Sequence, residues 1–322
     1  MSLDTIYKPI REDLAEVETR LGALTKVSYP RLSQLLGHSL GGGGKRVRPA
    51  LVLLSAKFYK YDLGSLLPMA VAIEVLHTAT LVHDDAIDHS PLRRGSLTIN
   101  QVWGEDKAIL LGDYLLAQAE ELVSQTQNLS VVRLFARAIM TLAGGELAQA
   151  FGAFNLEQTR EQYFARVAAK TASLLTLATE SGAILSRAPE KMVTALKDYG
   201  YSLGIAFQII DDILDFIGDE AEMGKPTGSD LSEGTLTLPA MMVLERCPGD
   251  NPIGRLFNHE GDRQENIRLA IELVGNSGVL EECYQVAQDY SARAGASLDP
   301  LPSEPARDSL AELARYVVAR KK

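Results

Sequence analysis

Two groups of aspartates have the types and spacing needed for chemistry. Asp84, Asp85 and Asp88 form one D-D-x-x-D pattern, and Asp211, Asp212 and Asp215 form a second. Both lie in apolar, helix-compatible stretches, so the first and last aspartates of each pattern share a helix face. Carboxylates crowded on an apolar helix repel each other and cost desolvation energy. Mg²⁺ prefers oxygen ligands shared with substrate phosphates, so the patterns predict a site that holds a diphosphate through metal ions.

An acidic run can also be an ordinary solvated helix face. One D-D-x-x-D pattern alone would be weak evidence for a site. Two copies, both in apolar rather than charged surroundings, favour the metal–diphosphate interpretation.

Basic residues stand beside glycine in three further segments: GGGGKRVRP at 41–49, PLRRG at 91–95 and MGKP at 223–226. Glycine lets backbone N–H groups approach an anion closely, and arginine grips a phosphate with two hydrogen bonds. The candidate phosphate contacts are Gly44, Lys45, Arg48, Arg93, Arg94 and Lys225. Flexible surface loops with incidental charge remain the alternative. No Walker loop is present, because Arg46 stands where that motif needs Ser or Thr.

Other polar residues lie in apolar stretches near these motifs. Lys170 and Thr171 follow small residues, and Gln208 stands three residues before Asp211 on a shared helix face. A lone lysine there is often a surface residue. His77, seven residues before Asp84, is a better candidate for an anion contact than His83, which could be a structural core histidine.

Composition limits the fold and the partners. Helical periodicity recurs along the 322 residues, strand signals are poor and no linker divides the chain, so we expect one all-α helix bundle over residues 1–322. Breaks are expected at 41–44, 90–95, 224–234, 247–262 and 297–307. A net charge of −10 disfavours nucleic acid as a binding partner. Neither a signal peptide nor a transmembrane helix is expected, and two cysteines without C-x-x-C spacing fit the cytoplasm.

These motifs, in this order, resemble the trans-type polyprenyl diphosphate synthases. GGGGKRVRP, HDDAID with PLRRG, FQIIDDILD and GKPTGSDLSEG each resemble a family signature, and together they run from about Gly41 to about Pro239. The resemblance implies an isoprenoid synthase bundle with a central substrate cavity. It also implies that an allylic diphosphate ionises and that isopentenyl diphosphate attacks the cation, followed by proton loss.

The resemblance implies a role for each matching residue. Lys45, Arg48, His77 and Arg94 match isopentenyl diphosphate contacts, and Arg93, Lys170, Thr171, Gln208 and Lys225 match allylic diphosphate contacts. Asp84, Asp88 and Asp211 match direct ligands of Mg²⁺, about three ions to a site, whereas Asp85, Asp212 and Asp215 match supporting positions. One departure is Thr235, where many relatives carry a lysine that contacts the allylic diphosphate.

The product is expected to grow from the metals toward the N-terminal end of the helix that bears Asp84. Ala79 and Thr80, one turn back, form the floor, and neither is aromatic. One turn spans about 5.4 Å, roughly one prenyl unit, so an open floor predicts an all-trans product of roughly C30 or longer. A farnesyl or geranylgeranyl product is the alternative.

Two further classes stay open at this stage: a class I terpene cyclase and a noncatalytic subunit of a heteromeric synthase. The family resemblance and the apolar helix from Ile109 to Val123 suggest a homodimer. Peripheral membrane contact would serve the release of a long product.

Overall fold

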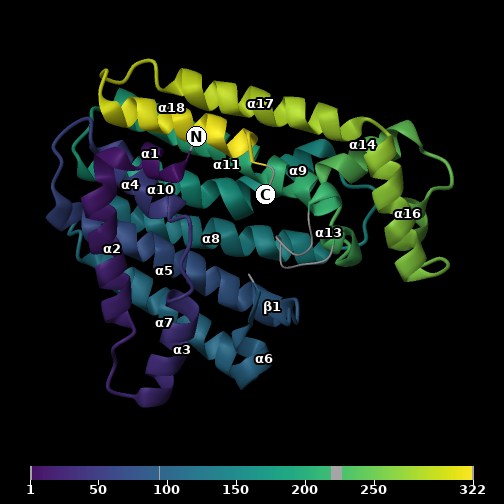
Figure 1. The fold of residues 1–322 in the computed structure, drawn as a ribbon, viewed down its shortest axis with the longest axis horizontal. Coiled ribbons are helices and arrows are strands. Elements are labelled where there is room, and N and C mark those ends of the chain that lie inside the picture. Colours follow the sequence, from purple (N-terminus) through teal and green to yellow (C-terminus); the bar gives the residue numbers. More distant parts are fainter. Residues whose placement is uncertain (1, 94, 219–226, 321–322) are drawn as a thin grey trace. The chain divides into compact units, whose positions relative to one another are not determined.

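The computed structural model describes residues 2–93, 95–218 and 227–320 (Figure 1). Helix accounts for 76% of the structure, so the prediction of an all-α fold is confirmed. The chain divides into two compact units, and several helices contribute residues to both. The expectation that residues 1–322 form a single domain stays a prediction.

The first unit comprises Met1–Ala138, Leu174–Gly200 and Ser297–Leu313. Its elements are α1 (Leu3–Ile6), η1 (Lys8–Ile10), α2 (Arg11–Leu24), α3 (Pro30–Leu40), α4 (Val47–Ala56), α5 (Leu63–Ile87), β1 (Leu92–Arg93), β2 (Ser96–Leu97), α6 (Ile99–Trp103) and α7 (Glu105–Ser124), with parts of α8 (Leu129–Phe151), α10 (Ser173–Leu185), α11 (Glu190–Ile217) and α18 (Pro305–Val318). β1 and β2 form a short antiparallel hairpin in which Leu92 faces Leu97.

Helix α5 is the core of this unit. Asp62 begins it by accepting a hydrogen bond from the backbone N–H of Gly64 at 3.1 Å. The helix is buried on most sides, from Leu66 through Leu76, as expected of a central core helix. Among the described residues it is the one helix long and apolar enough to cross a membrane, but 67% of its most apolar window is buried inside the fold.

The second unit comprises Ile139–Ser173, Tyr201–Ala296 and Ala314–Lys322. Besides its parts of α8, α11 and α18, it contains α9 (Arg160–Val167), η2 (Ala168–Ala172), α13 (Ser229–Ser232), α14 (Leu238–Arg246), α15 (Pro252–Phe257), α16 (Arg263–Asn276) and α17 (Val279–Ser297). Three expected breaks are corrected: the stretch 247–262 contains α15, 224–234 contains α13, and 90–95 contains β1. All three elements are too short for periodicity to reveal.

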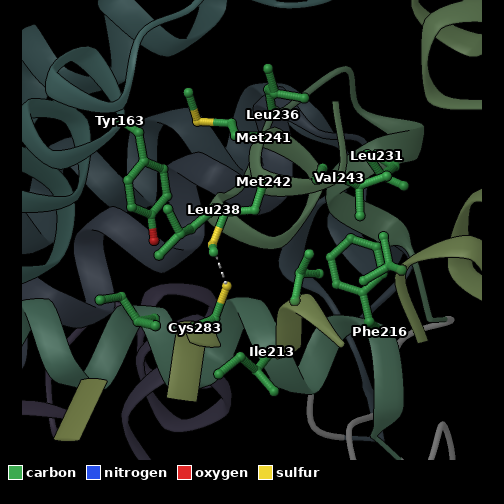
Figure 2. Packing of buried hydrophobic residues seen from close by; sticks show 14 of the residues in the cluster. Tyr163, Ile213, Phe216, Leu231, Leu236, Leu238, Met241, Met242, Val243 and Cys283 are labelled. Atoms are coloured by element: carbon green, nitrogen blue, oxygen red, sulfur yellow. Dashed lines mark hydrogen bonds between the residues drawn. The ribbon is translucent and has the colours of Figure 1, made fainter. Parts of the chain in front are cut away.

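A cluster of buried side chains forms the core of the second unit (Figure 2). Tyr163 of α9, Met242 of α14 and Cys283 of α17 belong to it. The Cys283 sulfur lies 3.4 Å from the Met242 sulfur, and burial raises the pKa of the Cys283 thiol to about 12. Both cysteines are free, and the thiolate is the reactive form of cysteine, so the buried Cys283 is protected, whereas Cys247 is exposed.

We therefore expect the native protein to react with one equivalent of a thiol reagent such as DTNB, and the unfolded protein with two. Cys247→Ser should abolish the native reaction, and Cys283→Ser should leave it intact. The measurement is the absorbance of the released thiolate with and without guanidinium chloride. Two fast thiols in the native state would contradict this packing.

Candidate active site

The first aspartate motif occupies the C-terminal turn of α5. The backbone N–H of Asp88 donates to the Asp84 carbonyl oxygen at 2.8 Å, which places the two residues one above the other. Asp84 is half-buried, Asp88 is exposed, and Asp85 is only 5% exposed. The motif thus has two carboxylates toward solvent and one turned into the unit.

Arg93 of β1 grips the buried carboxylate of this motif. Its Nε donates to both oxygens of Asp85 at 2.8 Å, and its Nη2 lies 2.8 Å from Oδ1. We expected Arg93 on an irregular loop; it lies instead on a strand, because the chain turns back at once into β2. The pairing gives Arg93 a partner within the protein, and its contact with a diphosphate stays a prediction.

His83 packs directly on helix α7, one residue before Asp84. A Cβ at Gly112 would lie only 2.2 Å from His83 Nε2. The same nitrogen lies 3.1 Å from the Ile109 carbonyl oxygen and 3.4 Å from Asp113. The alternative of a hydrogen-bonded structural histidine therefore fits His83, and these contacts fix the C-terminal turn of α5 against α7.

A cavity of about 370 Å³ lies within the first unit. The glycine-rich loop at Gly41–Gly43, the His77 and Leu81 face of α5, and Arg93 contribute to its wall. His77 lines this cavity, as predicted for a residue that binds isopentenyl diphosphate. Three other described residues with the same predicted role, Gly44, Lys45 and Arg48, do not line it. The structure therefore brings His77 and Arg93 to one cavity.

Sequence reasoning missed Arg46, the N-cap residue of α4. Its φ of 45° turns the chain at the end of the glycine run. The guanidinium group contacts Glu18 at 2.5 and 3.1 Å and the buried Glu74 at 2.7 Å. Although burial opposes the charge, these hydrogen bonds raise the pKa of Arg46 above its ordinary value. Arg46 thus anchors the loop to α2 and α5, a role that only its distant partners reveal.

The second aspartate motif lies on α11 in the second unit. Asp211 is partly exposed and lies 3.2 Å from Arg320. Asp215 is fully buried and accepts hydrogen bonds from the Ser229 hydroxyl at 2.8 Å and the Asp230 backbone N–H at 3.3 Å. Asp215 therefore anchors α13 to α11.

Asp212, 2% exposed, is held by neutral donors. The Tyr163 hydroxyl donates to it at 2.6 Å and the Gln208 amide at 2.8 Å. Burial, reinforced by the nearby charge of Asp230, raises the pKa of Asp212 to about 7. Gln208 in turn accepts from the Thr171 hydroxyl at 2.5 Å. The structure thus joins the predicted residues Thr171, Gln208 and Asp212 in one hydrogen-bonded chain.

Lys170 and Thr171 lie in η2, a segment with π-helical geometry rather than the regular helix that we expected. Such segments often mark functional sites, because the wider turn re-aims side chains. Lys170 lies 2.8 Å from Glu146 and 3.0 Å from Gln149, both on α8. Gly145 and Gly204 let the neighbouring helices approach η2, since a Cβ at either would clash with Ala169 or Ala172.

The remaining predicted residues are less directly placed. Arg94 and Lys225 lie outside the described residues. Thr235, which replaces the usual lysine, donates its backbone N–H to the Asp230 carbonyl oxygen at 2.8 Å. Ala79 is 2% exposed on α5, four residues before His83, so it lies on the face that packs toward α7. The Thr80 hydroxyl donates to the His77 carbonyl oxygen.

The donor set fits Mg²⁺ by its chemistry. In each motif a carboxylate with solvent exposure, Asp84 or Asp211, stands beside one that protein donors hold, Asp85 or Asp212. Carboxylate oxygens are the ligands that this hard cation prefers. Within the described residues, no three acidic, histidine or cysteine side chains already converge as a preformed metal cage.

An all-α fold that carries two D-D-x-x-D helices defines the isoprenoid synthase class of enzymes. Residues 29–274 match the polyprenyl synthetase family. The chain belongs to this family and is a trans-type polyprenyl diphosphate synthase, a prenyltransferase.

Known proteins resemble the chain over nearly its whole length. "Heptaprenyl diphosphate synthase component 2" of Bacillus subtilis is 38% identical, over 100% of this chain and 92% of its own. The crystal structure of polyprenyl synthase from Caulobacter crescentus, complexed with calcium and isoprenyl diphosphate, has a TM-score of 0.95 and 33% identity, covering 100% and 98% of the two chains. The crystal structure of a decaprenyl diphosphate synthase from Rhodobacter capsulatus has a TM-score of 0.91 and 36% identity, covering 100% of each chain.

Two neighbouring glycines on α8 provide a test of whether the position of η2 affects activity. A Cβ at Gly145 would lie 2.7 Å from Ala169 Cβ and 3.4 Å from Lys170 Cγ, whereas one at Gly144 meets nothing within 4 Å. Gly145→Ala should displace η2 and lower kcat/KM for the allylic diphosphate by up to about 100-fold, the cost of a misplaced catalytic group.

Gly144→Ala is the matched control. It should keep activity and raise the free energy of unfolding by roughly 0.5–1 kcal/mol, because alanine favours helix. Steady-state kinetics and denaturant unfolding measure both effects. Equal kinetics in the two variants would show that η2 does not depend on this close approach.

Proposed function

We propose that this synthase condenses isopentenyl diphosphate with an allylic diphosphate in an Mg²⁺-dependent ionisation, condensation and elimination. The product is all-trans and of roughly C30 or longer. The observation that carries the proposal is the division of each aspartate motif into carboxylates held by protein donors and carboxylates toward solvent. Supporting carboxylates keep their place in this arrangement while the others bind metal.

Asp84, Asp88 and Asp211 are the proposed direct ligands. Their half-buried or exposed positions support this role. Asp85, Asp212 and Asp215 are proposed to support the site, consistent with their bonds from Arg93, from Tyr163 and Gln208, and from Ser229. Calcium with isoprenyl diphosphate in the Caulobacter crescentus relative supports a divalent cation.

The proposed diphosphate contacts divide between the two substrates. Isopentenyl diphosphate binds through Lys45, Arg48, His77 and Arg94, with the cavity beside His77 as support. The allylic diphosphate binds through Arg93, Lys170, Thr171, Gln208 and Lys225. Because Arg93 and Lys170 are already paired with carboxylates, they can bind phosphate by exchanging one anionic partner for another.

The chemistry needs stabilisation of a leaving diphosphate rather than a protein nucleophile. Mg²⁺, when bound, supplies Lewis-acid stabilisation of that charge. Lys170 and Arg93 add positive charge where the diphosphate departs. The apolar surroundings of α5 and α11 exclude water from the allylic cation. The departing diphosphate is the proposed proton acceptor for the final elimination.

A medium-to-long product agrees with the names of the relatives, a heptaprenyl synthase component and a decaprenyl synthase. It also agrees with the small side chains of Ala79 and Thr80. Ala79 is buried on the α7-facing side of α5, where a growing chain that follows the helix axis would pass. A bulky residue there would close the path.

A homodimer is the proposed assembly, with α7 at the contact. Ile109 and Leu110 are 45% and 66% exposed in the single chain, and such apolar exposure is typical of an interface. Because the Bacillus subtilis relative is named "component 2", a complex with a different subunit is the second candidate. Light scattering of the purified protein, alone and with added candidate subunits, separates these assemblies.

The metal assignment predicts that Asp84→Ala or Asp211→Ala lowers kcat by more than about 100-fold, beyond the usual effect of losing an outer-shell partner. The fold should persist, because neither carboxylate is fully buried. Kinetics at several Mg²⁺ concentrations and circular dichroism test this. The matched control is Asp198→Ala, an exposed aspartate on α11, which should keep full activity. Near-normal kcat in either motif variant would reject the two-motif mechanism.

Product length is tested with labelled isopentenyl diphosphate, several allylic primers and mass analysis. The wild type should give roughly C30 or longer, and Ala79→Tyr should shorten the product to about C15 or C20, because an aromatic ring occupies one helical turn of the path. Ala79→Ser keeps the size of the side chain and should leave the product unchanged. An unchanged product in Ala79→Tyr would show that α5 does not form the floor.

A further inference from the structure

Tyr163 of α9 belongs to the apolar core of the second unit, yet its hydroxyl reaches an aspartate motif. The side chain is 0% exposed and packs within the cluster shown in Figure 2. Its hydroxyl donates to Asp212 Oδ2 at 2.6 Å, across 49 residues of sequence. Burial strongly raises the pKa of Tyr163, so the hydroxyl keeps its proton and acts as a donor.

A second donor fixes the other oxygen of the same carboxylate. Gln208 Nε2 donates to Asp212 Oδ1 at 2.8 Å, and the Thr171 hydroxyl donates to Gln208 Oε1 at 2.5 Å. The bond from Thr171 sets which end of the amide faces Asp212, since only the NH₂ end can donate. Asp212 is thus oriented from two sides, through both of its oxygens.

These two donors to Asp212, Tyr163 and Gln208, are neutral groups. By contrast, Arg93, which donates to Asp85, carries a positive charge. A neutral donor orients a carboxylate without cancelling its charge. Neither donor therefore adds a positive charge that would repel a cation at Asp211, the adjacent residue. An arginine as the donor would instead bring a positive charge that repels that cation.

We propose that Tyr163 is a positioning residue for metal binding at the second aspartate motif, acting through Asp212 on Asp211. The inference rests on the proposed function, because it assigns Tyr163 to the Mg²⁺ site rather than to the core alone. Gln208 and Thr171 help to position Asp212 in the same way, in addition to their proposed contacts with the diphosphate. Outer-shell hydrogen bonds of this kind orient ligands and tune affinity.

Tyr199 provides a matched control. It is likewise 0% exposed, and its hydroxyl donates to the Leu310 carbonyl oxygen at 2.7 Å within the first unit. Replacing either tyrosine by phenylalanine keeps the ring and removes one buried hydrogen bond. Both variants should therefore lose similar stability, and only Tyr163→Phe should alter metal binding.

The experiment titrates Mg²⁺ alone into the full-length protein, by isothermal titration calorimetry. Tyr163→Phe should weaken Mg²⁺ binding by about 10- to 100-fold, the usual range for losing an outer-shell partner. Tyr199→Phe should bind Mg²⁺ like the wild type. Thermal unfolding without Mg²⁺ should show comparable decreases in Tm for the two variants.

Asp211→Ala separates this inference from the proposed function. If Asp211→Ala loses Mg²⁺ affinity and Tyr163→Phe does not, the proposed function stands and the role of Tyr163 is overturned. If Asp211→Ala binds Mg²⁺ normally, the second motif is not a metal site, and both proposals are overturned. Equal losses of Mg²⁺ affinity in Tyr163→Phe and Tyr199→Phe would show that Tyr163 acts only as a core residue and would overturn its proposed role.

Discussion

Carboxylates on apolar helices need partners, and this requirement organises both units. An unpaired buried carboxylate is strongly disfavoured, so each one recruits donors from another segment. Asp85 recruits Arg93, Asp212 recruits Tyr163 and Gln208, and Asp215 recruits Ser229. These bonds tie the β1–β2 hairpin and the helices α9 and α13 to the aspartate-bearing helices. The segments that surround each motif are therefore held by the motif itself.

The two motifs meet the same requirement by different means. At Asp85, an arginine with 39% of its side chain exposed supplies a full positive charge. At Asp212, neutral groups supply orientation within a fully buried environment. The first arrangement can exchange partners with an incoming phosphate, because Arg93 is accessible. The second is fixed by packing, so it defines a constant geometry for Asp211.

Close backbone approach is the second means by which the fold positions polar groups. Gly112 admits the ring of His83, and Gly145 admits η2 with Lys170. Even one methyl group at these positions would overlap neighbouring atoms, and a packed interior cannot absorb such an overlap without shifting. Glycines far from the aspartates in sequence thus set where His83 and Lys170 lie. Arg46 acts similarly at the glycine-rich loop, through its bonds to Glu18 and Glu74.

The sequence by itself determined the helical class, the placement of both aspartate motifs on helices and the family, because helical periodicity and motif spacing are local properties. Only the tertiary structure decided which carboxylates are held and by whom. Tyr163 and Asp212 are 49 residues apart, and Arg46 lies 28 residues from Glu18 and from Glu74. No local pattern encodes such pairs, since they form only when separate helices pack. The π-helical turn at Lys170 and the strand at Arg93 escaped prediction for the same reason: packing against neighbours, rather than local propensity, fixes their backbone.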